Sequence, residues 1–493
     1  MSLVGPIEAE APPPPLYAAP PRIYPRAVKG RIRRVKWAVL IVLLGLYYVV
    51  PWLRFDRGPG LPDQAVLVDL GHARLFFFWI ELWPQEVYFL TGVLVLAAIG
   101  LFAATSLYGR VWCGFTCPQT VWTDLFMLVE RLVQGDRNAR MKRDAQPSSL
   151  DRTLRKAATH AAWIAIAAAT GGAWIMYFND APTVVRAIAT GAASIEVYFF
   201  FGLFTLTTYV LAGFAREQVC TYMCPWPRFQ GAMLDENSLV VTYRDWRGEP
   251  RGKPREAMSG DCVDCAACVN VCPTGVDIRE GQQLGCIGCG LCIDACDDVM
   301  RKLDRPEGLI AFEALRNLAA SQSATGGMPP SAKRFAIGMA ARSAPRFFRP
   351  RTIMYAAVLG VVLAVMAGAF LMRETVSLSV LRDRAPLYVQ LADGGLRNGF
   401  TIKLVNKTQA RVAYSLTLRG LDGATLLVQQ AALDGEGRPL LVSSPDGITE
   451  WRALVTIPAA RRLTGSHPVV FEIRDPLGQA IATAQATLVG PAQ

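Results

Sequence analysis

Residues 262–296 read CVDCAACVNVCPTGVDIREGQQLGCIGCGLCIDAC. The first four cysteines are spaced C-x2-C-x2-C-x3-C and are followed by a proline. The last four cysteines repeat this spacing, with Asp297 where the proline would stand. Two such runs in tandem are typical of bacterial ferredoxins that hold two [4Fe–4S] clusters. The stretch therefore predicts a ferredoxin-type domain.

The fourth cysteine of each run is expected to bind the cluster of the other run. The predicted ligands of one cluster are Cys262, Cys265, Cys268 and Cys296. The predicted ligands of the second cluster are Cys286, Cys289, Cys292 and Cys272. Because the two sets are crossed, neither cluster site can form without the other. The chemistry predicted for this domain is the transfer of single electrons.

A pair of zinc sites is the alternative interpretation, because cysteine thiolates also bind Zn²⁺. Zinc knuckles rarely use this spacing twice, which favours iron–sulfur clusters. Disulfides are disfavoured, because the segment is predicted to face the cytoplasm, where thiols stay reduced.

The composition indicates a membrane protein. Of the 493 residues, 52% are hydrophobic, and several long apolar runs are expected to span a bilayer. The formal net charge is +11, but the basic residues stand beside the apolar runs, as the positive-inside rule describes. We therefore expect the partner to be the lipid bilayer and not nucleic acid. All 12 cysteines lie between Cys113 and Cys296, which favours metal ligands over disulfides.

The sequence predicts a multidomain membrane protein with five transmembrane helices. The predicted spans are residues 37–53, 87–107, 160–178, 197–214 and 353–372. The predicted segments are a disordered basic cytoplasmic tail (1–36), a four-helix membrane domain (37–214), a cytoplasmic 2[4Fe–4S] ferredoxin domain (215–320), a linker (321–352), the fifth transmembrane helix (353–372) and a periplasmic domain (373–493). Basic residues on one side of every span place the N-terminus and the clusters in the cytoplasm of a bacterial inner-membrane protein.

The periplasmic domain is predicted to be an all-β immunoglobulin-like sandwich. Its β-rich runs are separated by turn signals such as Asp422-Gly423, and about seven short strands are typical of that fold. The runs are residues 387–391, 400–405, 412–418, 425–429, 451–457, 469–473 and 480–488. We expect this domain to be a docking or stabilising domain without chemistry of its own.

A second set of cysteines forms two C-x3-C-P motifs, Cys113–Pro118 and Cys220–Pro225. Each follows an apolar run, so the first four spans resemble two repeats of span, outer loop, span and cysteine pair. If the repeats pack symmetrically, the four thiols meet at the inner membrane surface. The prolines place Cys117 and Cys224 at helix N-termini, where we expect lowered thiol pKa values. Unbroken helices, with each pair at positions i and i+4, are the alternative geometry.

These four thiols are predicted to bind a metal or to act in redox chemistry, and inert buried thiols are the alternative. Soft thiolates select Cu(I), Zn²⁺ or iron–sulfur iron. Met223 offers a thioether, although interfacial packing is the preferred explanation of this residue. His72 and His160 are not counted as ligands. Asp124, Glu130 and Asp235 stand near the pairs and offer oxygen ligands to Cu(II), although a helix-surface position explains them without that role.

Four stretches resemble the cytochrome c oxidase accessory proteins of the CcoG/FixG/RdxA type, and the likeness covers nearly the whole chain. They are CGFTCPQTVWTD (113–124), GDRNARMK (135–142), CTYMCPWPRFQGAM (220–233) and GDCVDCAACVNVCPTGVDIR (260–279). The resemblance implies the same clusters and C-terminal domain, and a cupric reductase that makes Cu(I) for assembly of cbb3-type cytochrome c oxidase. It also implies that Cys113, Cys117, Cys220 and Cys224 are the catalytic, copper-handling thiols.

The expected function is therefore Cu(II) reduction, with copper as substrate or transient ligand. The expected partners are a cytoplasmic electron donor and the oxidase assembly machinery or copper chaperones, and a homodimer is left open. One alternative is a quinol-linked polyferredoxin electron-transfer subunit. The other is a non-enzymatic copper-binding assembly factor.

Overall fold

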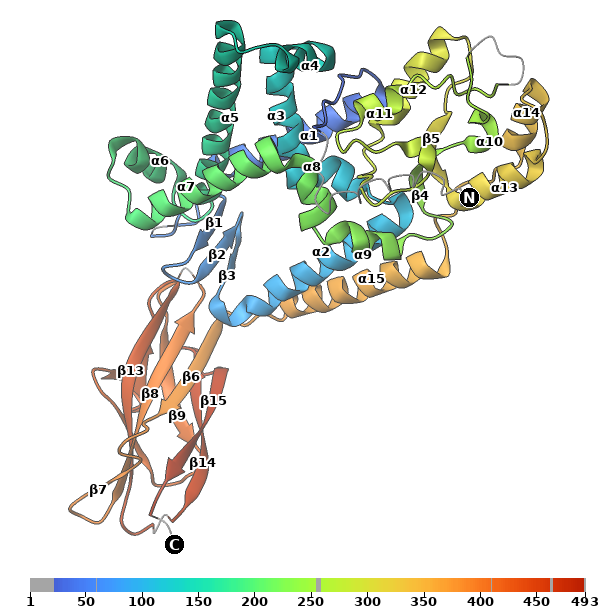
Figure 1. Ribbon diagram of the computed structural model, residues 1–493. Helices are drawn as coiled ribbons and strands as arrows, with labels where there is room; N and C mark the ends of the chain where they lie inside the picture. Colours follow the sequence, from blue (N-terminus) through green and yellow to red (C-terminus); the bar gives the residue numbers. More distant parts are fainter. Residues whose placement is uncertain (1–21, 59, 254–258, 409, 462–463, 492–493) are drawn as a thin grey trace, which may run out of the picture. The chain divides into compact units, whose positions relative to one another are not determined.

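The computed structural model describes residues 22–58, 60–253, 259–408, 410–461 and 464–491. The chain forms two compact units, residues 1–366 and residues 367–493, and each is described by itself. The first unit contains long apolar helices and the ferredoxin-type region, and the second consists of β-strands after the last turn of helix α15 (Pro350–Leu371) (Figure 1). Residues 1–21 of the predicted tail lie outside the described residues.

Among the described residues, four helical segments are long and apolar enough to cross a membrane: Arg31–Trp52, Pro84–Tyr108, Ile195–Met223 and Pro350–Leu371. They contain the helices α1 (Arg31–Val49), α2 (Val87–Tyr108), α7 (Ile195–Val210) and α15 (Pro350–Leu371). Helices α2 and α15 lie side by side (Figure 1), and a Cβ on Gly92 would lie 2.5 Å from the sulfur of Met366.

The predicted count of five spans is not confirmed. The remaining candidate, α5 (Leu150–Met176), forms a long helix but is not among the four apolar segments. Its first two turns carry Asp151, Arg152, Arg155 and Lys156, and the rest is rich in alanine. Helix α5 packs closely on α7. The approach leaves no room for a side chain at Gly171, since a Cβ there would lie 2.8 Å from Thr205 Oγ1.

The predicted disorder of the tail is wrong for residues 22–36. Residues 22–30 run as an extended segment against the rest of the first unit, and α1 begins at Arg31. The Arg26 backbone N–H donates to Asn270 O at 2.8 Å, and Tyr24 Oη donates to Asp144 at 2.9 Å. Sequence composition missed this order because the contacts come from distant parts of the chain.

The ferredoxin-type region surrounds two short helices, α11 (Ala267–Val271) and α12 (Leu291–Lys302). Strands β4 (Leu239–Tyr243) and β5 (Ile310–Ala314) pair antiparallel and lie on either side of the cysteine runs in the sequence. The short helices α10 (Asp245–Gly248) and η6 (Ile278–Glu280) complete the region.

The predicted linker at residues 321–352 is wrong over much of its length. Helices α13 (Leu315–Thr325) and α14 (Ala332–Ala340) occupy it, and α14 packs on α10 so closely that a Cβ on Gly338 would lie 2.3 Å from the Trp246 ring. The buried Glu313 of β5 pairs with Arg244 at 2.6 Å and also with Arg342. The Gly, Pro and Ser content of this stretch concealed two short helices whose order comes from packing.

A three-stranded antiparallel sheet stands between the first two apolar segments. It consists of β1 (Val66–Asp69), β2 (Arg74–Phe77) and β3 (Ile80–Leu82). Helix α6 (Ala181–Thr190) lies between α5 and α7 in the sequence, and α4 (Arg137–Ala145) follows α3 (Pro118–Gln134).

The second unit is a sandwich of two antiparallel sheets. One sheet has the strand order β10-β13-β8-β6, with β7 also pairing β8, and the other has the order β11-β12-β9-β14-β15. The strands of the first sheet are β6 (Val376–Arg382), β7 (Val389–Gln390), β8 (Leu396–Asn406), β10 (Thr425–Val428) and β13 (Gly447–Ile457). Those of the second are β9 (Ala413–Arg419), β11 (Ala432–Leu433), β12 (Pro439–Val442), β14 (Ser466–Arg474) and β15 (Ala480–Val489).

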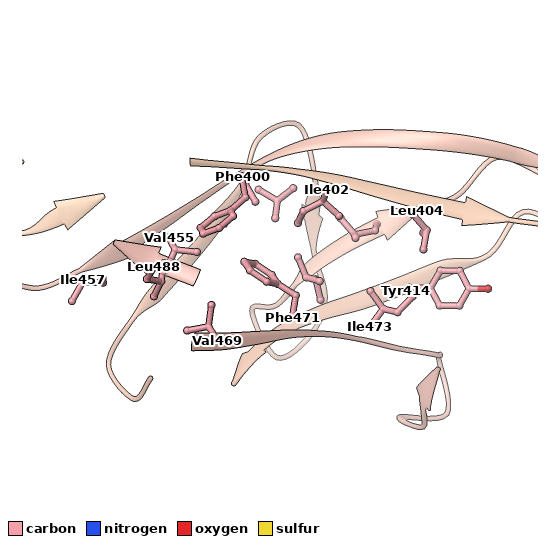
Figure 2. Packing of buried hydrophobic residues seen from close by; sticks show 14 of the residues in the cluster. Phe400, Ile402, Leu404, Tyr414, Val455, Ile457, Val469, Phe471, Ile473 and Leu488 are labelled. Carbon is pink, nitrogen blue, oxygen red and sulfur yellow. The ribbon is translucent and has the colours of Figure 1, made fainter. Parts of the chain in front are cut away.

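Alternating residues of both sheets fill the core of the sandwich. Phe400 of β8 and Phe471 of β14 are fully buried, and their rings meet edge to face with centroids 5.3 Å apart (Figure 2). Strands β6, β11 and β12 were not predicted; β12 begins at Pro439, and β11 has only two residues.

Candidate functional site

The structure gathers Cys262, Cys265, Cys268 and Cys296 around one cavity. Cys262 and Cys265 lie in the loop before α11, Cys268 lies in α11, and Cys296 lies in α12. Burial raises the pKa of Cys296 to about 12, and the charges of Cys268, Cys262 and Cys265 also raise it. This mutual influence shows that the fourth cysteine of the second run stands among the first three of the first run.

Cys272, Cys286, Cys289 and Cys292 form the second group. Burial raises the pKa of Cys292 well above its ordinary value, and the charges of Cys289, Cys286 and Cys272 raise it further. Gly290 precedes α12 with φ +70, and a Cβ there would lie 3.0 Å from Ile32 Cδ1 of α1. A glycine is therefore required where this cysteine run meets the first apolar helix.

Both groups suit an iron–sulfur cluster in their donor chemistry. Each offers four cysteine sulfurs, which is the ligand set of a [4Fe–4S] centre, and all of them except the exposed Cys265 are buried or partly buried. Among the residues that the structure describes, no three or more His, Cys, Asp or Glu side chains are arranged around a single ion. In a cubane each thiolate binds a different iron, so its ligands need not converge on one point. The protons that burial keeps on these thiols have to leave when metal binds.

The two C-x3-C-P motifs adopt the same local structure. Residues Trp112–Thr116 (η3) and Val219–Met223 (η5) form single wide turns in which the N–H of the second cysteine donates five residues back. The Cys117 N–H donates to Trp112 O at 2.8 Å, and the Cys224 N–H donates to Val219 O at 2.7 Å. Pro118 then begins α3, and Pro225 precedes α9 (Trp226–Met233). The predicted break before each proline is present, and the helices do not run unbroken through the pairs.

The four thiols of these motifs lie close enough to influence one another. The pKa of Cys113 is raised to about 12, mainly by burial and also by the charges of Cys117, Cys220 and Cys224, while the charge of Arg110 acts in the opposite direction. The Cys113 thiol also donates to Gln230 Oε1 at 3.1 Å. The repeats therefore bring both pairs to one place, as the sequence pattern predicted.

The predicted lowering of the thiol pKa is wrong for Cys117. Burial raises the pKa of Cys117, although the backbone N–H groups of Thr120 and Gln119 lower it. The helix N-terminus lowers the thiol pKa, as expected, but the removal of the thiol from water raises that pKa by more. A metal ion that binds these thiols has to displace their protons.

The membrane-edge thiols pack directly on the second ferredoxin group. A Cβ on Gly114 would lie 2.9 Å from both Cys289 Cα and Gly288 O, so only glycine fits there. Cys113, Cys289 and Leu291 share one buried apolar cluster, and Cys220 and Cys292 pack against it.

Arg110, which precedes the first C-x3-C-P motif, holds the motif against the second ferredoxin group through hydrogen bonds. Its guanidinium donates to Cys286 O at 2.8 Å, to Leu284 O at 2.6 Å and to Pro227 O at 3.0 Å. The side chain thus connects the loop before the second ferredoxin group with α9, which follows the second C-x3-C-P motif.

The three carboxylates proposed as oxygen ligands are already paired. Asp124 contacts Arg33 and Lys36, Glu130 contacts Arg140 and Arg216, and Asp235 contacts Arg349. Asp124 and Glu130 are buried, so the interpretation of them as helix-surface charges is wrong. Asp124 lies in an ion cluster that sequence reasoning missed, because the basic residues near α1 were read only as a topology signal.

The histidines and Met223 stand apart from the thiols. The Nδ1 atom of His160 lies 3.0 Å from Tyr209 Oη, and the ring stacks on Phe214. The Nδ1 atom of His72 lies 2.8 Å from Asp69 on an exposed turn. Met223 is 62% exposed, as an interfacial residue would be.

Comparison with known proteins matches three parts of the chain to families. Residues 215–315 match the 4Fe-4S dicluster domain, residues 90–134 match the 4Fe-4S binding domain, and residues 366–491 match the IG-like fold at the C-terminus of FixG. The match at residues 90–134 contains Cys113 and Cys117.

Three relatives are similar over most of their length. The chain is 50% identical to the nitrogen fixation protein FixG of Rhizobium meliloti over 465 residues, which cover 91% of this chain and 88% of that protein. It is 47% identical to protein RdxB of Cereibacter sphaeroides over 455 residues, 91% of this chain and 88% of that protein. It is 45% identical to protein RdxA of the same species over 418 residues, 85% of this chain and 86% of that protein.

The fold and the thiol groups define a membrane-bound iron–sulfur oxidoreductase that transfers electrons, with a C-terminal immunoglobulin-like domain. Within that class, the chain belongs to the FixG/RdxA family. This confirms the family resemblance, the iron–sulfur clusters and the C-terminal fold that the sequence predicted.

Proposed function

We propose that this member of the family is a cupric reductase, which makes Cu(I) for the assembly of cbb3-type cytochrome c oxidase. The observation that supports it most directly is the packing of the C-x3-C-P thiols on the second ferredoxin group. The Gly114 backbone lies against Cys289, and both cysteine sets share one buried cluster. A soft-donor site thus adjoins a site for an electron-transfer centre.

The eight ferredoxin cysteines have separate tasks in this proposal. Cys262, Cys265, Cys268 and Cys296 hold one [4Fe–4S] cluster, and Cys286, Cys289, Cys292 and Cys272 hold the other. When bound, these clusters supply single electrons at low potential. The surrounding loops exclude water and supply backbone N–H groups to the sulfurs, which tunes the potential.

The membrane-edge thiols bind the substrate. Cu(II) bound by thiols of the set Cys113, Cys117, Cys220 and Cys224 takes up one electron from the adjacent centre and becomes Cu(I), the copper ion that thiolates retain best. Among the described residues no three of these thiols already surround a single point, so binding by more than two of them requires the thiols to move together. Cys113 is buried, and the other three thiols are partly exposed. Gln230 and Thr120 orient this first pair: Gln230 accepts from the Cys113 thiol, and Thr120 Oγ1 donates to Cys113 O at 2.6 Å.

The proposed orientation follows the distribution of charge around the apolar segments. The N-terminus and the thiol groups face the cytoplasm, and the immunoglobulin-like domain faces the periplasm of a bacterial inner membrane. The proposed partners are a cytoplasmic electron donor and the oxidase assembly machinery or copper chaperones. Reporter fusions after residue 252 and after residue 435 test this orientation, because only the second is expected to report export.

The functional test uses anaerobically purified full-length protein. Chemically reduced wild type is expected to convert Cu(II) to Cu(I), followed with a Cu(I)-specific chelator, while EPR follows the iron–sulfur signals. A variant with Ala at Cys113, Cys117, Cys220 and Cys224 is expected to keep its iron and lose the Cu(II) reduction. Met223→Leu, at an exposed neighbour of the same motif, is the matched control and is expected to match wild type.

Each other result has a defined meaning. Undiminished Cu(II) reduction by the quadruple variant removes these thiols from the mechanism. Oxidation of quinol by the purified protein without copper favours the quinol-linked alternative. Oxidase maturation that survives loss of the clusters favours the non-enzymatic assembly factor.

A further inference from the structure

The first apolar helix is attached to the ferredoxin-type region through Asp294. This carboxylate lies in α12 between Cys292 and Cys296, and it accepts the backbone N–H groups of Ile32 at 3.2 Å and Arg33 at 2.7 Å. It thereby satisfies free N–H groups of the first turn of α1. A Cβ on Gly30 would lie 2.1 Å from Asp294 Cγ, so the approach is close. The position of α1 relative to the cysteine runs is therefore fixed.

One turn further along α1, Lys36 is buried beside Asp124. Lys36 is 3% exposed and Asp124 is 1% exposed, and Lys36 Nζ lies 3.3 Å from Asp124 Oδ2. The same carboxylate accepts two hydrogen bonds from Arg33 Nη1, at 2.9 Å and 2.8 Å. The cluster thus holds two cations around one carboxylate. Burying an excess charge is costly unless an anion lies nearby.

The Arg33 side chain supports this reading. Arg33 is 6% exposed, and its Nη2 has no hydrogen-bond partner within the part of the chain that the structure describes. Buried guanidinium nitrogens are normally paired. The Arg33 guanidinium also lies over the Trp37 ring, with Cζ 4.4 Å from the ring centroid, so of its buried nitrogens only Nη2 is left without an acceptor among the described residues.

The second ferredoxin group lies next to this excess charge. Lys36 lines one cavity together with Ile287, which stands between Cys286 and Cys289, and with Pro273, which follows Cys272. Ile287 also belongs to the buried cluster that contains Cys289, and Cys292 packs against that cluster. The cavity of the first group is lined by no residue of α1 among those that the structure describes.

We propose that Lys36 is a positioning residue of the second group, whose cysteines are Cys272, Cys286, Cys289 and Cys292. The buried ammonium of Lys36 compensates the negative charge of the centre that these cysteines hold. It thereby raises the reduction potential of that centre. A reduced cluster carries one more negative charge than an oxidised one, so a nearby cation favours the reduced form. The proposal rests on the proposed function only in that this group holds an iron–sulfur cluster. Copper has no part in it.

The test is an EPR-monitored redox titration of the anaerobic full-length protein without added copper. Lys36→Met is expected to shift one of the two midpoint potentials to a lower value, while the other moves less. Lys36→Arg is expected to restore the wild-type value. Asp124→Asn, which removes the opposing charge, is expected to shift the same centre upward. Lys29→Met, an exposed lysine before α1, changes the net charge equally and is expected to leave both potentials unchanged.

Opposite shifts in the Lys36→Met and Asp124→Asn variants distinguish an electrostatic role from damage to the fold, because damage would not reverse its sign. If Lys36→Met protein does not retain iron, Asp124→Asn and Lys36→Arg decide the question alone.

The proposal is overturned if an iron-loaded Lys36→Met protein keeps both wild-type potentials, or if the two potentials move equally. It is also overturned if Asp124→Asn lowers the potential. A protein that shows the expected shifts but no Cu(II) reduction retains this proposal and loses the cupric reductase.

Discussion

The ferredoxin-type region and the immunoglobulin-like sandwich are stabilised in different ways. The sandwich contains a continuous core of buried aliphatic and aromatic side chains from both sheets (Figure 2). In the ferredoxin-type region, the two buried clusters include cysteines among their members. Several of the buried side chains in this region are therefore the predicted cluster ligands. Buried ion pairs such as Arg244–Glu313 hold its edges.

The core of the sandwich consists of apolar side chains, whereas that of the ferredoxin-type region includes predicted metal ligands. Phe400, Ile402 and Leu404 of the sandwich have no exposed surface, and burial of such side chains stabilises a fold. The eight ferredoxin thiols repel one another when ionised, and four of them are buried. Metal binding is therefore expected to supply folding free energy to that region alone.

Removal of iron gives the largest expected effect. Structural metal sites contribute on the order of 10 kcal/mol to folding. Hydrogen exchange on chelator-treated protein is expected to show lost protection in α11 and α12 and unchanged protection in β13 and β14. Equal loss in both regions would contradict the comparison.

Phe400→Ala is expected to destabilise only the sandwich, by about 3–5 kcal/mol, because it removes a buried ring from the centre of the core. Hydrogen exchange in β8 and β14 measures the loss, and the iron–sulfur EPR signals are expected to stay unchanged. Leu427→Ala is the control, because Leu427 is 60% exposed in the same sandwich and should cost far less. Altered EPR signals in Phe400→Ala would show that the two regions are not independent.

Gly114→Ala tests the contact between the membrane-edge thiols and the second ferredoxin group. The new Cβ would meet backbone at 2.9 Å, and overpacking of this kind costs about 1–3 kcal/mol. We expect iron to be retained and Cu(II) reduction to fall, by up to about 100-fold for a displacement near 1 Å. Gly172→Ala is the control, because its Cβ would meet no atom closer than 3.6 Å. Wild-type reduction by Gly114→Ala would show that this close approach is not needed.

Asp294→Ala gives the smallest expected effect. It leaves the first N–H groups of α1 without their acceptor, which costs about 1 kcal/mol for a helix cap. Faster hydrogen exchange at residues 32–34 is the expected result. Asp298→Ala, on the exposed side of α12 where Asp298 pairs with Lys302, should leave those residues unchanged. Unaltered exchange at residues 32–34 in Asp294→Ala would mean that the cap contributes nothing.

Local patterns were sufficient where the chemistry is local. The two ferredoxin runs, the C-x3-C-P breaks and the alternating strands β8 and β13 were predicted because spacing and periodicity within a few residues define them. The short strands β6 and β12 and helices α13 and α14 were missed, since their order depends on neighbours far away in the sequence. Four apolar segments were recognised, whereas α5 carries charges in its first turns and leaves the fifth span unconfirmed.

The candidate site shows the same limit. The pattern of residues predicted the two cysteine sets and the meeting of the four membrane-edge thiols. It did not predict that Gly114 would lie against Cys289, that Asp294 would cap α1, or that Lys36 and Arg33 would surround Asp124.

The donor atoms, the apolar segments and the family can be predicted from the amino-acid sequence, because each depends on residue identity and spacing along the chain. The folded structure is needed to see which thiol group adjoins the membrane-edge cysteines and which buried cations accompany it. Burial and charge pairing depend on distances between segments that lie up to some 260 residues apart, such as Arg33 and Asp294.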